Sequence, residues 1–117
     1  MSTDAELTAG VAVHLERTLV VSTAHVTMAD SLALPSLVER DGLAMTVVCY
    51  PYGWIISVPC CESMSGCQTR LREAGLSEAL PRLLELALRV GATLLRLDAD
   101  GYELPEELAP THEWVSA

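Results

Sequence analysis

The feature that most constrains the fold is a one-sided helix expected over residues 78–90. Its apolar residues recur every three or four positions and so share one wide face: Leu80, Leu83, Leu84, Ala87 and Leu88. Ser77 precedes the segment as an N-cap, and Gly91 follows it as a typical helix stop. Such a face must be covered, so the rest of the chain has to supply a matching apolar surface.

The other side of this helix alternates acidic and basic residues at helical spacing: Glu78, Arg82, Glu85 and Arg89. Pairs three or four residues apart stabilise a helix modestly when they face water. The pattern therefore indicates a solvated face.

Short β-branched and apolar runs predict that the matching surface is a β-sheet. Four strands are expected, over residues 17–22, 44–50, 54–58 and 93–97. Val11–Leu15 either extend the first strand or form a short strand before it. Pro51 and Gly53 flank a single residue between the second and third runs, which predicts a hairpin.

Between the first two strands, Thr27 and Asp30 have the spacing of a capping box. The helix they begin should run to about Arg40 and stop at Gly42. Pro35 lies inside it and predicts a kink or two short helices. Its buried stripe is expected to be Leu34, Leu37 and Val38. After the hairpin, residues 60–66 are small and polar and predict a loop, followed by a short helix over 68–74.

The resulting order, β-α-β-β-α-β, predicts an α+β fold of the ferredoxin-like, split βαβ type. Its four-stranded sheet would carry the two main helices on one face. A length of 117 residues, half of them hydrophobic, suits one domain over 1–117. Residues 98–117 are expected to form an acidic segment that packs on this domain or is partly mobile.

The charge is strongly negative, with 16 acidic and 7 basic residues and a net charge of −9. This balance disfavours direct binding to nucleic acid or to an anionic membrane, because both depend on neutralising phosphates. It favours a protein partner with a basic surface, or serves solubility alone. No apolar run is long enough to span a bilayer, and the first residues lack the basic character of a secretory signal, so a cytoplasmic protein is expected.

The acidic residues concentrate near the C-terminus, where six occur from residue 98 onward without an intervening arginine or lysine: Asp98, Asp100, Glu103, Glu106, Glu107 and Glu113. Leu104, Leu108 and Trp114 are candidates to pin this segment to the domain. A fixed row of carboxylates would resemble a phosphate backbone to a basic groove, whereas the alternative is a merely solvated terminus.

Three aromatic residues gather at the predicted hairpin: Tyr50, Tyr52 and Trp54. Tyrosine and tryptophan in a projecting turn can anchor a partner, because they bring a large contact area at low entropic cost. The alternative is that they fold back and seal the end of a small core.

A second set of candidate residues is His25 with Cys60, Cys61 and Cys67. In a ferredoxin-like sheet the first and third strands are parallel neighbours, which would place His25 close to Cys60 and Cys61. A thiol beside an imidazole is the minimum for a cysteine nucleophile, and this set could also hold zinc. The cysteine spacing lacks the C-x2-C pair that structural zinc sites favour, so a structural role is preferred and no cofactor is expected.

Several segments resemble a bacterial family of small uncharacterised domains. The quoted segments are Leu19–Thr27 (LVVSTAHVT), Val48–Trp54 (VCYPYGW) and Leu95–Asp98 (LRLD). Members of that family are carried on plasmids and other mobile elements, so the resemblance implies a setting and no mechanism. Residues 60–75 depart from the family pattern and look like an insertion.

Three hypotheses follow. The first is a non-enzymatic inhibitor of a host-defence complex, of the anti-CRISPR or anti-restriction kind, which covers a basic nucleic-acid-binding surface with the acidic residues and the hairpin aromatics. The second is a metal-binding protein or thiol enzyme built on the histidine and the cysteines. The third is an accessory protein of a plasmid or toxin system that forms oligomers through its sheet.

Overall fold

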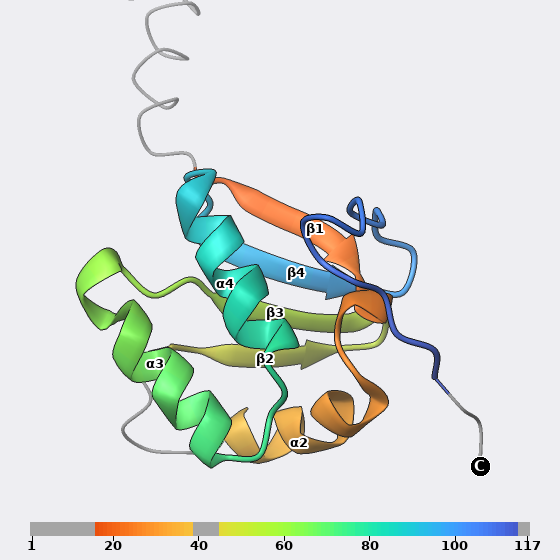
Figure 1. Ribbon diagram of the computed structural model, residues 1–117, viewed down its shortest axis with the longest axis horizontal. Helices are drawn as coiled ribbons and strands as arrows, with labels where there is room; N and C mark the ends of the chain where they lie inside the picture. Colours follow the sequence, from red (N-terminus) through yellow and green to blue (C-terminus); the bar gives the residue numbers. More distant parts are fainter. Residues whose placement is uncertain (1–15, 39–44, 115–117) are drawn as a thin grey trace, which may run out of the picture.

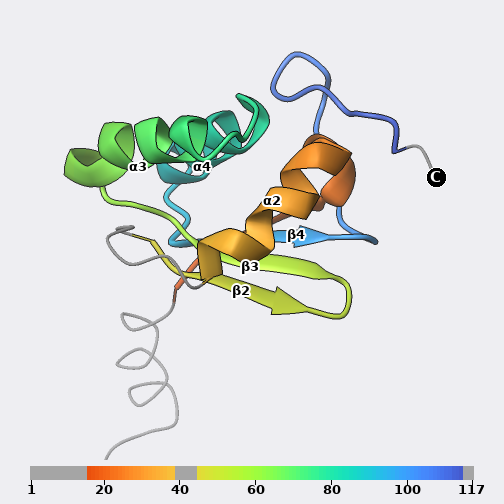
Figure 2. The same ribbon diagram turned by 90° about the horizontal axis from the view of Figure 1, so that it is seen from below.

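The computed structural model describes residues 16–38 and 45–114, which form a four-stranded sheet with helices on one face (Figures 1 and 2). The strands are β1 (Thr18–Ser22), β2 (Val47–Tyr50), β3 (Gly53–Ser57) and β4 (Leu94–Asp98). The helices are α2 (Met28–Val38), α3 (Cys61–Glu73) and α4 (Ala79–Arg89), with a short 3-10 turn, η1 (Thr23–His25). Among the described residues, no helix combines the length and apolarity needed to cross a membrane. The predictions for Val11–Leu15 and for a helix stop at Gly42 fall outside them.

The sheet has the order β1-β4-β3-β2, in which β1 and β4 are parallel and the other neighbouring pairs are antiparallel. The predicted α+β class is therefore confirmed, but the ferredoxin-like strand order, which needs β1 beside β3, is not. The reason is that β4 occupies that place. Leu95 of β4 lies between Leu19 of β1 and Ile56 of β3 and is fully buried, as a residue of an interior strand should be.

The core lies between the sheet and the helices. Alternate strand residues point toward α4, and Val21, Ile56, Leu95 and Leu97 have no exposed surface. From α4, the predicted apolar face supplies Leu80, Leu83, Leu84 and Ala87, all buried. The helix identified from sequence periodicity is thus the main cover of the sheet.

The other sheet face is not covered by any described element (Figure 2). Val20, Val48, Ile55 and Leu94 surround Arg96 there, and Val48 is 48% exposed. The hypothesis that the sheet mediates oligomerisation stays a prediction.

Helix α3 differs from the sequence prediction. The expected loop over 60–66 and short helix over 68–74 form instead one helix of 13 residues from Cys61. Met64, Cys67 and Leu71 are buried at helical spacing, so the small polar residues between them form its solvent side. The segment therefore contributes to the core, and its insertion relative to the family pattern stays a prediction.

The starts of α2 and α4 are tied together by the buried carboxylate of Asp30. Thr27 and Asp30 form the predicted capping box: the Asp30 N–H donates to Thr27 Oγ1 at 3.0 Å and the Thr27 N–H to Asp30 Oδ2 at 3.2 Å. Asp30 also accepts from the Ser77 N–H at 2.8 Å and from its hydroxyl at 2.6 Å. The Ser77 hydroxyl in turn accepts from the N–H of Ala79, the first residue of α4. One carboxylate therefore fixes two helix starts, through a contact between residues 47 positions apart in the chain.

Burial raises the pKa of Asp30, but the hydrogen bonds from Ser77 and Thr27 outweigh it and hold this pKa below its ordinary value. A group whose folded pKa lies below its unfolded pKa stabilises the fold above the unfolded value, about 4. That contribution is lost as the pH falls through the folded pKa.

We therefore expect Asp30→Asn to lower the free energy of unfolding at pH 7 by about 1–3 kcal/mol, because one donor that faces the carboxylate loses its acceptor. Its stability should also fall less than that of the wild type between about pH 5 and pH 2, since the titrating group is gone. Urea unfolding followed by circular dichroism measures both effects. Asp100→Asn, at an exposed aspartate, is the matched control. An Asp30→Asn variant with wild-type stability at pH 7 and across the acidic range would show that Asp30 does not fix the two helix starts.

Candidate functional site

Residues 99–114, called here the strap, lie across the sheet end where β1 and β4 finish (Figure 1). At its beginning, Gly101 lies so close to β1 that an added Cβ would overlap the carbonyl of Val21. The Ser22 N–H donates to Tyr102 O at 2.9 Å, and the His112 N–H donates to Ala24 O at 2.8 Å. Over the described residues, the acidic C-terminal segment is therefore packed on the domain.

His25 holds the middle of the strap. The side chain is 1% exposed, and its Nε2 accepts a hydrogen bond of 2.7 Å from the Leu104 N–H. Its Nδ1 lies 3.2 Å from Pro110 O, to which it donates when the ring is the neutral Nδ1–H tautomer. Both ring nitrogens thus form hydrogen bonds with the strap, and His25 fixes the strap to the domain. We call this pair of bonds the fastening.

The expected closeness of His25 to Cys60 and Cys61 is wrong. β1 and β3 run antiparallel, since β1 is parallel to β4 and β3 is antiparallel to it. His25 follows β1 and Cys60 follows β3, so the two lie at opposite ends of the sheet. Cys67 lies on the buried face of α3. Within residues 16–38 and 45–114, no group of three or more His, Cys, Asp or Glu side chains is placed to hold a metal ion.

Cys60 is chemically distinct from the other thiols. It is exposed, immediately precedes α3, and its Sγ lies 3.4 Å from Ser63 Oγ. Hydrogen bonds from the Ser63 side chain and then its backbone lower the pKa of the Cys60 thiol. Cys49 and Cys61 are also exposed, and all four cysteines are free thiols.

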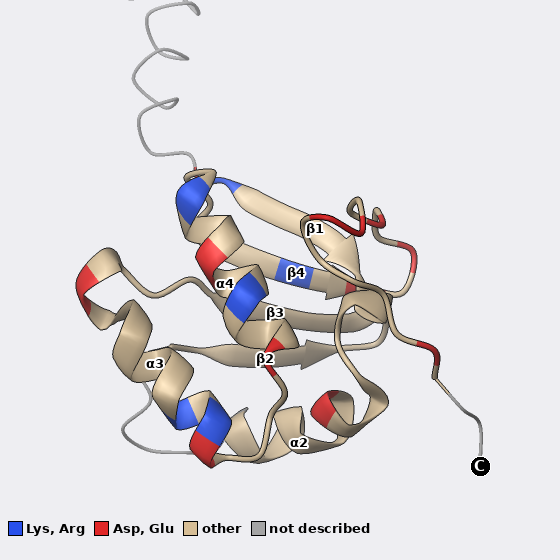
Figure 3. Ribbon diagram, in the orientation of Figure 1, with Lys and Arg blue, Asp and Glu red and all other residues tan. Residues whose placement is uncertain are grey.

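The predicted acidic residues fall into two groups. Five are exposed on the strap: Asp100, Glu103, Glu106, Glu107 and Glu113. Figure 3 shows acidic residues along the strap, with the basic residues on α3, α4 and the strands. Asp98 instead accepts a 2.6 Å hydrogen bond from the Tyr50 hydroxyl, so it is engaged within the domain. This contact lowers the pKa of Asp98; burial and the bond to Asp98 raise the pKa of Tyr50 to about 12.

The hairpin aromatics are divided as well. Tyr52 is 62% exposed, and its carbonyl accepts from the Ala99 N–H at 2.8 Å, so the hairpin tip adjoins the start of the strap. Trp54 packs against the core, because its place in β3 faces inward beside Leu97. Tyr52 is therefore placed to contact a partner, whereas Trp54 folds back onto the core.

Sequence reasoning missed two exposed side chains on the strap. Tyr102 is 68% exposed and Leu108 is 50% exposed, although Leu108 was expected to pin the strap inward. Ala109 takes that inward position at 4% exposure, and Leu104 packs against the core as predicted. The single turn after Pro105 directs Ala109 inward and Leu108 outward. No sequence signal distinguishes Leu108 from Ala109 as the buried residue.

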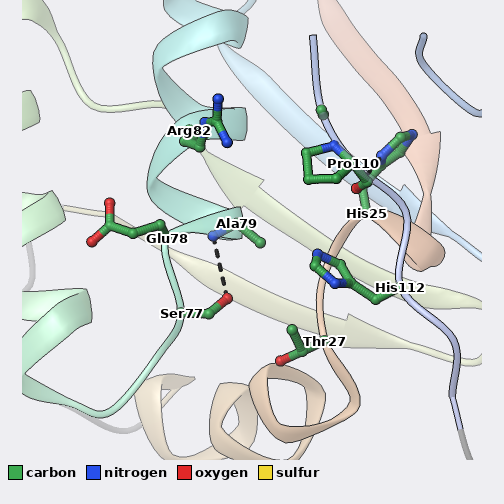
Figure 4. A pocket seen from close by; sticks show the side chains of 9 residues that line it. His25, Thr27, Ser77, Glu78, Ala79, Arg82, Pro110 and His112 are labelled. Atoms are coloured by element: carbon green, nitrogen blue, oxygen red, sulfur yellow. Dashed lines mark hydrogen bonds between the residues drawn. The ribbon is translucent and has the colours of Figure 1, made fainter. Parts of the chain in front are cut away.

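A cavity of about 230 Å³ lies between the strap and the start of α4 (Figure 4). His25, Ser77, Arg82 and His112 contribute to its lining. The Nε2 of His112 is buried and has no hydrogen-bond partner among the described residues. A buried polar atom without a partner costs about 1–3 kcal/mol, and its presence calls for an explanation.

These features define a small α+β domain with an acidic strap folded across one end of its sheet. Residues 18–114 match the family described as "Family of unknown function (DUF5983) C-terminal domain". The chain belongs to this family, and the match extends from the start of β1 to the end of the described strap. The predicted membership in a family of unknown function is confirmed, whereas the carriage of such domains on mobile elements stays a prediction. No curated protein and no solved structure matches the chain.

At neutral pH we expect Cys60 to react with iodoacetamide faster than Cys49 and Cys61, because a lower pKa leaves more of the thiol as the reactive thiolate. Cys67 should react slowest, because it is buried. Timed alkylation followed by peptide mass spectrometry gives the four rates. Ser63→Ala should remove the advantage of Cys60, whereas equal rates at the three exposed cysteines of the wild type would contradict the assignment.

We expect His25→Ala to release the strap, because the Leu104 N–H and the Pro110 carbonyl both lose their partner. A glutamate-specific protease should then cut at Glu103, Glu106 and Glu107 at least about tenfold faster. Leu71→Ala is the control, since it removes a fully buried side chain of α3 and leaves the fastening in place. Equal acceleration in both variants would mean that His25 stabilises only the domain as a whole.

Proposed function

We propose that this protein is a non-enzymatic binding protein whose acidic strap covers a basic, nucleic-acid-binding surface of a protein partner. The observation that carries the proposal is the fastening of the strap: five exposed carboxylates lie on a segment fixed by His25 and by backbone hydrogen bonds. Carboxylates held before binding lose less conformational entropy on association than those of a mobile tail.

The charge of the chain supports fast and selective encounter with such a partner. The net charge is −9, and the strap contains no arginine or lysine that would divide its negative potential. Opposite potentials steer two surfaces together, and the rate falls steeply as salt rises. A basic groove that normally holds phosphates would meet carboxylates instead.

Exposed apolar groups beside the carboxylates supply contact area that charge alone does not give. Tyr52 projects from the hairpin next to Ala99, while Tyr102 and Leu108 are exposed on the strap itself. Tyrosines with large accessible area are frequent anchors at interfaces. The proposed contact surface therefore consists of the five strap carboxylates with Tyr52, Tyr102 and Leu108.

The biological setting is part of the proposal: we place the protein on a mobile element, as the sequence resemblance implies. A small acidic protein in that setting has a clear use if it blocks a nuclease complex of host defence, because blocking a groove requires no active site. The proposed partner is accordingly a CRISPR or restriction complex. Both kinds of complex bind nucleic acid in a basic groove, which the acidic strap would cover.

The test is capture of binding proteins from host extract by the tagged chain, followed by measurement of Kd for the purified partner at about 50 and 300 mM salt. Glu103→Gln, Glu106→Gln and Glu107→Gln combined should weaken binding at least about tenfold at low salt. The matched control, Glu16→Gln, Glu62→Gln and Glu73→Gln combined, removes the same charge from exposed positions outside the strap and should change Kd much less. Duplex DNA should compete with the wild-type chain.

Two results would contradict the proposal. If both triple variants weaken binding equally, only net charge matters and the strap is not the contact surface. If Cys60→Ser abolishes binding while the strap variant does not, the function belongs to the thiol at the opposite end of the sheet.

A further inference from the structure

The cavity between the strap and α4 has features that the proposed function does not use. Its volume is about 230 Å³, and it lies on the α4 side of the strap. Figure 4 shows the imidazole of His112 extending from the strap toward Ser77 and Ala79 at the start of α4. The ring lines the cavity, yet its buried Nε2 has no partner among the described residues.

The charged groups around the cavity favour an anion. Arg82 lines it, and none of the described ion pairs involves Arg82. Glu78 also borders the cavity, but its carboxylate points away in Figure 4 and is held by Arg72 at 2.6 and 2.9 Å. The start of α4 adds the partial positive charge of a helix N-terminus. The nearby carboxylate of Asp30 is already occupied by Ser77 and Thr27.

The remaining walls of the cavity are apolar. Ala79, Ala109 and Pro110 form part of the lining. Since one water molecule takes about 30 Å³ of liquid, the cavity volume corresponds to about seven or eight water molecules. An inorganic anion would leave the apolar walls without contact, whereas a short alkyl chain would cover them.

We propose that this cavity binds a small monocarboxylate, with its carboxylate between Arg82 and His112 and its alkyl chain against Ala79, Ala109 and Pro110. The guanidinium of Arg82 donates a charge-assisted hydrogen bond to the carboxylate of the ligand. His112 supplies its otherwise unpaired Nε2 as the second donor, as the Nε2–H tautomer. The site is separate from the outward-facing carboxylates, so its failure and the failure of the proposed function are independent.

The test is titration of the ¹⁵N-labelled full chain with sodium butyrate at constant ionic strength, followed by NMR. Butyrate should cause saturable shifts of the amides of Ala79, Arg82 and His112 and of the His112 imidazole nitrogens. Butyramide has the same shape without the charge and should bind at least about tenfold more weakly. Inorganic phosphate should cause no saturable shift at these positions.

Variants assign the contacts. Arg82→Gln should weaken butyrate binding at least about tenfold, while Arg89→Gln, two turns further along α4 and outside this cavity, should leave it unchanged. His112→Gln should weaken it less, because the amide can still donate. Equal binding of butyrate and butyramide, an unchanged Kd in Arg82→Gln, or the absence of saturable shifts would overturn the proposal. Saturation by phosphate but not by butyrate would overturn the carboxylate assignment.

Discussion

The arrangement of the proposed binding surfaces depends on the two hydrogen bonds of His25. The imidazole is inside the protein at the end of β1, and it joins Leu104 and Pro110, which lie about 80 residues later in the chain. These contacts turn an acidic terminus into a folded strap with a defined outer and inner side. The outer side carries the carboxylates, and the inner side closes the cavity beside α4. One buried side chain, His25, thus fixes the strap, and with it both proposed binding surfaces, to the end of the sheet where β1 finishes.

The elements that depend on local sequence were predictable. The capping box of Thr27 and Asp30, the hairpin at Pro51 and the apolar face of α4 all have signals within a few residues, and the structure confirms them. The strand order was not predictable, because it depends on the pairing of β1 with β4, which are far apart in the sequence. Only the first half of α3 was missed, because Ser65 and Gly66 on its exposed side are typical of a loop, while the second half was predicted as a short helix.

The candidate site was predictable in its chemistry and less so in its geometry. The run of acids and the projecting tyrosine are visible in the sequence, whereas the inward direction of Trp54 follows from its register with Leu97. The pairing of His25 with the cysteines failed because β1 and β3 run in opposite directions, so the residues that follow them lie at opposite ends of the sheet. Arg82 and His112 carry no sequence signal as a pair: one belongs to a charge pattern typical of a solvated helix face, and the other is an isolated histidine. Only the folding of the strap against α4 brings them to one cavity.

The central claim is that the strap is folded in the free protein and does not order only on binding. The most direct measurement is amide hydrogen exchange at Leu104 in the isolated chain at neutral pH, because this N–H donates to an imidazole nitrogen and to no backbone carbonyl. In a folded strap this amide exchanges at least about a hundredfold more slowly than the same amide in an unstructured peptide, as expected for a buried hydrogen bond that exchanges only on local opening. Exchange at the rate of the unstructured peptide would show that the strap is not folded in the free protein and that its carboxylates belong to a mobile tail.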